Sequence, residues 1–154
     1  MIARRLPHRH LLESVRLERW HRSAIYIVTA FLVASGAVWL GLHYFEHGNE
    51  ASSSLPNPLE PMAMKLHGAA AMVALTLYGG LINAHMRKAW RLGRNRVSGS
   101  VVATIVALLI ATAWLLYYAG GESLRAIGSA LHWGLGFAIA LILPLHIRLG
   151  RRSR

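Results

Sequence analysis

Four long segments without Asp, Glu, Lys or Arg constrain this chain more than any other feature of its sequence. They cover residues 23–45, 66–86, 97–121 and 126–147. Each reaches the roughly 20 residues that a helix needs to cross about 30 Å of hydrocarbon, since a helix rises about 1.5 Å per residue. The sequence therefore predicts an all-α integral membrane protein. We expect a four-helix transmembrane bundle, with helices over about 21–45, 62–86, 97–119 and 124–147.

Composition supports a membrane protein and excludes several chemistries. Hydrophobic residues make up 55% of the chain, above the roughly 45–50% of soluble proteins. The net charge of +11 is confined to the segments between the apolar stretches, which argues against a nucleic-acid-binding surface. The chain has no cysteine, so disulfides, iron–sulfur ligation, thiol nucleophiles and covalent c-type haem attachment are excluded. A metal would have to be held by histidine or oxygen.

The positive charges predict the orientation of the bundle. Of the 17 Lys and Arg residues, all but Lys65 and Arg125 lie in the N-terminal segment, the 87–96 loop or the tail from residue 148. Four helices place these three segments on one side, and the positive-inside rule makes that side cytoplasmic. We therefore expect a multi-pass protein of a prokaryotic inner membrane with both termini cytoplasmic. Residues 1–20 would form a basic cytoplasmic arm, either interfacial or solvated, and residues 149–154 a basic tail.

Histidines inside the apolar segments point to a functional site, because histidine is costly in a membrane. His132 and His146 are 14 residues apart on the fourth helix. Fourteen residues turn through about 1400°, which is within about 40° of four full turns, and rise about 21 Å along the helix. One face of the helix can therefore present two imidazoles at two depths. An electron-transferring haem iron takes two axial ligands, for which two imidazoles serve. The spacing therefore suggests two haems, each needing a partner histidine on a facing helix.

The partner histidines follow from depth along the helices. His67 lies about as deep in the second helix as His132 does in the fourth, on the outer side. On the cytoplasmic side, His21 opens the first helix and His85 closes the second. Helix geometry does not decide which of His21 and His85 is the partner of His146. His67 and His85 are 18 residues apart, which is about five turns, so His85 would lie on the same face as His67.

The segment from His132 to His146, together with Lys-Leu-His67-Gly and Arg-Trp-His21-Arg, resembles the bacterial cytochrome b561 family. The layout is also similar to the membrane cytochrome b subunits of formate dehydrogenase and nickel–iron hydrogenase. The resemblance implies that residues 21–148 form one domain with two non-covalent b-type haems. It implies an inner haem on His21 and His146 and an outer haem on His67 and His132, with His85 as the substitute for His21.

The resemblance also implies the partners. Quinone or quinol would exchange electrons near one haem, and a second redox protein, a cytochrome c or an iron–sulfur subunit, would complete the path. The chain would then be an electron-transfer subunit or quinone-linked oxidoreductase component of a respiratory chain, as a homodimer or within a larger complex. Polar residues near the cytoplasmic ends of the helices are candidates for binding a quinone headgroup: Asn83, His85, Arg87 and Ser98.

Two other functions fit the sequence less closely. A small membrane scaffold or assembly subunit without haem would use its histidines structurally and would purify colourless. A histidine-based metal transporter should carry acidic residues or broken helices in mid-membrane. The apolar segments contain no acidic residue, so the transporter ranks last.

Overall fold

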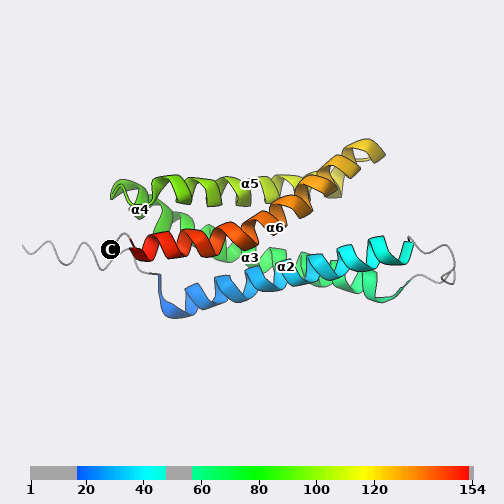
Figure 1. The fold of residues 1–154 in the computed structure, drawn as a ribbon, viewed down its shortest axis with the longest axis horizontal. Helices are drawn as coiled ribbons and strands as arrows, with labels where there is room; N and C mark the ends of the chain where they lie inside the picture. The colour runs from blue at the N-terminus through cyan, green and yellow to red at the C-terminus, as the bar shows by residue number, and fades with distance from the viewer. Residues whose placement is uncertain (1–16, 48–56, 153–154) are drawn as a thin grey trace, which may run out of the picture.

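The computed structural model describes residues 17–47 and 57–152, and helices make up nearly all of these two ranges (Figure 1). Four helices are long: α2 (Arg19–His47), α3 (Leu59–Leu81), α5 (Arg96–Tyr118) and α6 (Glu122–Arg152). A π-helical turn, η1 (Ile82–Met86), and the short α4 (Arg87–Arg91) continue from the end of α3.

The prediction of four membrane-spanning helices is confirmed by length and composition. In the part of the chain that the structure describes, four helical stretches are long and apolar enough to cross a membrane. The second consists of α3, η1 and α4 together, over residues Leu59–Arg91. The described residues thus form the all-α architecture expected of a multi-pass membrane protein.

The helix ends differ from the predicted ones at several points. α6 continues through Arg152, whereas the sequence suggested a separate tail from residue 149. Arginines are good helix formers and favourable in a last turn, where they face the negative end of the helix dipole. Of the predicted basic arm, residues 1–16 lie outside the described residues, as do residues 153–154 of the tail.

The helices associate as two antiparallel pairs. α2 packs along most of α3, and α5 packs along α6. A smaller contact between α2 and α6 joins the pairs. Figure 1 shows that α2 begins, and α6 ends, at the end of the bundle where α4 lies. The described basic segments therefore gather at one end, as the charge distribution predicted.

The interior between the helix pairs contains few tightly buried side chains. Among the described residues, no side chain is less than 2% exposed. Five apolar residues of the described chain are buried: Ile25, Ala63, Ala74, Ile105 and Ile139. The buried polar residues are all hydroxyl-bearing: Thr29, Ser35 and Thr112. Buried hydroxyls need hydrogen-bond partners, and two of these three find theirs on histidines.

The π-helical turn η1 contains His85. The predicted shared face of His67 and His85 assumes α-helical spacing from one to the other. A π turn has i→i+5 hydrogen bonds and so contains more residues per turn. Because the π turn covers residues 82–86, the assumed spacing does not hold over the last turn before His85. π turns are frequent at functional sites.

Candidate functional site

His67 and His132 lie next to each other between the two helix pairs. His67 comes from α3 and His132 from α6, and their ring centroids are 6.2 Å apart with an angle of 78° between the ring planes. Two imidazoles that bind one iron from opposite sides, with bonds of about 2 Å, have centroids roughly 6 Å apart. Their separation therefore fits a shared axial ligation.

Ser35 of α2 fixes the orientation of the His67 ring. Its hydroxyl lies 3.0 Å from His67 Nδ1 and also donates to the carbonyl of Phe31 at 2.8 Å. A hydroxyl has one proton. Because that proton points to the carbonyl, the histidine Nδ1 carries its own proton and donates to Ser35. His67 Nε2 is then the nitrogen with a free lone pair.

The close approach of α2 to the His67 ring depends on Gly36. A Cβ atom at this position would lie 3.2 Å from His67 Cε1, closer than ordinary van der Waals contact. Gly36 therefore lets Ser35 come within hydrogen-bond distance of the ring.

Thr112 of α5 holds His132 in the same way. The Thr112 hydroxyl lies 2.8 Å from His132 Nδ1 and donates to the carbonyl of Leu108 at 2.8 Å. His132 Nε2 is therefore also left with its lone pair. Hydrogen bonds to the non-ligating nitrogen are the usual support of metal-binding histidines, since they set the tautomer and the ring direction.

His146 has a third hydroxyl partner. Ser98 of α5 lies 2.9 Å from His146 Nδ1, and its hydroxyl reaches the carbonyl of Asn95 at 3.4 Å. Ser98 and Thr112 are 14 residues apart on α5, as His132 and His146 are on the antiparallel α6. Each histidine of α6 thus meets one hydroxyl of α5 at its own depth.

His85 lies in η1 on the same side of the bundle as His146. Its Nδ1 is buried, and it has no hydrogen-bond partner among the described residues. An unsatisfied buried ring nitrogen is costly unless a ligand or ion uses it, so His85 is a candidate to bind a group together with His146.

His21 is directed toward α3 instead. Its Nε2 lies 3.2 Å from the carbonyl oxygen of Leu77, and because a carbonyl only accepts, this nitrogen donates. A Cβ on Gly80 would lie 3.3 Å from His21 Cε1, and the ring stacks on Trp20. The structure thus places His21 against α3.

The four candidate quinone residues lie at one end of the bundle but have different partners. Arg87 donates to the side chain of Asn83 at 3.1 Å. Ser98 contacts His146 instead, and His85 has its unpaired Nδ1. Ser98 therefore belongs with the histidines rather than with the Asn83–Arg87 pair.

His43 contacts a carboxylate at the opposite end of the bundle. Its Nδ1 lies 2.8 Å from Glu60 Oε1, and its ring stacks on Trp39 with centroids 4.7 Å apart. The position of His43 at the outer end of the first apolar segment predicts a wet interfacial imidazole. The Glu60 partner was missed because the two residues belong to different helices, joined by a loop that sequence spacing does not place.

Comparison with known proteins adds no assignment. No family model, curated protein or solved structure matches this chain. Within residues 17–47 and 57–152, no three His, Asp or Glu side chains come together to hold a single metal ion. A haem requires less of the protein, because the porphyrin supplies four of the iron ligands and only the two axial positions remain.

Proposed function

We propose that this chain is a di-haem b-type cytochrome that carries electrons across a membrane between the quinone pool and a partner redox protein. The observation that carries the proposal is the His67–His132 pair. The two rings come from different helix pairs at a separation that suits one iron, and a hydroxyl on each Nδ1 leaves each Nε2 free. Each haem, when bound, supplies an iron that accepts and returns one electron.

The outer haem would be held by His67 and His132. For the inner haem, His146 is one ligand, and the second is His85 or His21. The resemblance favours His21. The contacts of the described residues favour His85, because its buried Nδ1 has no hydrogen-bond partner among them, whereas His21 donates to the α3 backbone. We therefore assign His85 as the inner partner.

The proposed setting is the inner membrane of a prokaryote, with both termini in the cytoplasm. Its support is the gathering of arginines and lysines at the end of the bundle where α2 begins and α6 ends, since cytoplasmic loops are enriched in these residues. The quinone headgroup would bind near the Asn83–Arg87 pair at this end. The second redox partner would be a cytochrome c or an iron–sulfur subunit.

Thr112→Val should weaken the outer haem without removing a ligand. The change keeps the side-chain shape but removes the hydroxyl that lies 2.8 Å from His132 Nδ1, and loss of such a partner typically weakens metal binding by roughly 10–100-fold. The imidazole also becomes a poorer electron donor, so the midpoint potential of one haem should become more positive. Redox titration and haem retention under dilution measure the two effects.

Thr112→Ser is the matched control for this variant, because it keeps the hydroxyl. It should restore both the potential and the retention. If Thr112→Val and Thr112→Ser behave alike, the hydroxyl does not act through His132.

Electron transfer from quinol tests the function beyond haem binding. Protein in vesicles should show reduced haem absorbance after a short-chain quinol is added without any other reductant. Asn83→Ala should slow this reduction while dithionite still reduces the haem fully. Haem that dithionite reduces but no quinol reduces would contradict the quinone assignment and leave the haem assignment intact.

A further inference from the structure

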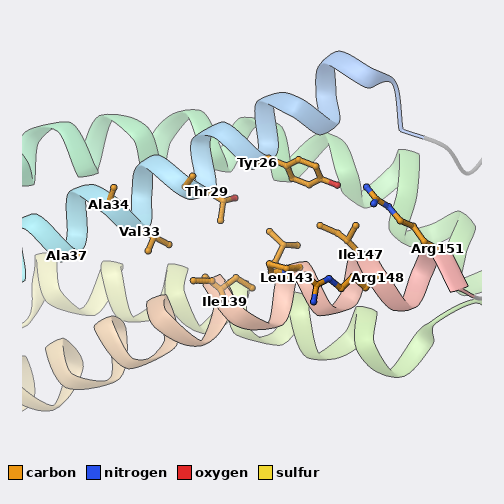
Figure 2. Close-up of a pocket in the computed structure, with 13 residues that line it drawn as sticks. Tyr26, Thr29, Val33, Ala34, Ala37, Ile139, Leu143, Ile147, Arg148 and Arg151 are labelled. Carbon is orange, nitrogen blue, oxygen red and sulfur yellow. The ribbon is translucent and has the colours of Figure 1, made fainter.

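A cavity of about 600 Å³ lies between α2 and α6, apart from the histidine contacts. Figure 2 shows Val33 and Thr29 of α2 pointing across it toward Ile139 and Leu143 of α6. The lining is mostly apolar, and none of it is histidine. The cavity thus offers a hydrocarbon-lined space that the proposed haem ligands do not use.

Two arginines close one end of this cavity. Arg148 and Arg151 of α6 both line it, together with Tyr26 of α2 (Figure 2). They are three residues apart and so lie on neighbouring positions of one helix face. Among the described acidic side chains, Glu60 contacts His43 near the opposite end and Glu18 accepts from Trp20, so neither contact involves these arginines. The charges of Arg148 and Arg151 are therefore available to a ligand.

An apolar cavity that ends in two guanidinium groups is suited to bind an amphiphile with an acidic headgroup. Arginine binds phosphate through two parallel hydrogen bonds, and basic pockets between transmembrane helices bind anionic lipid headgroups. Alanines on α2 widen the space beside Val33: Ala30, Ala34 and Ala37. An acyl chain would lie along these residues, with its phosphate at the end of the bundle where α6 terminates.

We propose that the groove between α2 and α6 binds one anionic phospholipid, with its phosphate on Arg148 and Arg151 and an acyl chain beside Val33 and Leu143. The site depends only on these two helices. It does not depend on the haem assignment, and haem content can be measured on the same samples.

Lipid retention by the full-length protein tests this proposal. Protein from vesicles with equal phosphatidylglycerol and phosphatidylcholine of the same acyl chains is purified, and its bound lipid is measured by native mass spectrometry. We expect about one phosphatidylglycerol to remain bound. Arg148→Gln with Arg151→Gln should weaken it by roughly 30-fold, from about 1 kcal/mol per cation. The control, Arg91→Gln with Arg152→Gln, removes the same charge outside the cavity and should retain the lipid.

A second pair of variants tests the groove without a charge change. Ala34→Trp fills the cavity from an exposed position and should lose the lipid, whereas Val38→Trp, also exposed on α2 but outside the lining, should keep it. Equal retention of the two lipids, equal loss in both arginine pairs, or retention in Ala34→Trp would overturn the proposal. Displacement of the lipid by glycerol phosphate alone would also overturn the proposal, because it would show a simple anion site. Displacement of the lipid by a neutral quinone would overturn it by showing a quinone site.

Discussion

His132→Ala and His67→Ala should each lower the haem content from about two per chain to about one, and the double variant should lose no more. The reason is that the two ring centroids lie 6.2 Å apart between the helix pairs. Removing either ring leaves an iron without one axial ligand and breaks the same site. The pyridine haemochrome assay of protein expressed with excess haem gives the count.

His43→Ala is the matched control for these variants. It also removes an imidazole from a membrane-spanning helix, but this imidazole contacts the carboxylate of Glu60. It should keep both haems. A double variant that loses both haems, while each single variant loses one, would show that His67 and His132 do not share an iron.

His85→Ala should remove the inner haem, while His21→Ala should leave about two haems per chain. His85 has a buried ring nitrogen without a hydrogen-bond partner among the described residues and lies at the same end of the bundle as His146. His21 already donates to the carbonyl of Leu77 and stacks on Trp20. Haem counting of the two variants, beside His146→Ala, makes the comparison.

The opposite result for His85→Ala and His21→Ala would identify His21 as the inner ligand. Loss of one haem in His21→Ala, with both kept in His85→Ala, would support the ligand set implied by the resemblance to cytochrome b561. It would also mean that α2 turns its His21 face toward α6 when the cofactor is bound.

The four helices could be predicted from the sequence because the requirement for about 20 apolar residues per span leaves little choice. The ends were less predictable. Charged residues extend α6 past residue 147 to Arg152, since a helix can continue into the interface after the apolar run ends. The π turn at residues 82–86 leaves no mark in hydropathy, and it breaks the α-helical spacing over the last turn before His85.

The site could be predicted in part, through the histidines of α3 and α6. The hydroxyl groups that contact these histidines were not predicted from the sequence, although Ser35 and Thr112 are polar residues in apolar helices. The spacing of Ser98 and Thr112 repeats that of His146 and His132, and this was the available signal. The pairing of Ser35 with His67 depends on the packing of α2 against α3, which sequence periodicity does not give.

The two helix pairs contact each other mainly through α2 and α6, while the rings of His67 and His132 come from α3 and α6. A cofactor bound by both rings would therefore link the two pairs. Ligands that bind only the folded state stabilise it, so haem would contribute to holding the bundle together as well as to its redox function.

The central claim is tested most directly by the dithionite-reduced minus oxidised absorbance spectrum, with a haem count, of protein purified after haem-replete expression. The account predicts the spectrum of a b-type cytochrome and about two haems per chain. A colourless, folded protein would contradict it and would favour a membrane scaffold in which the histidines are structural.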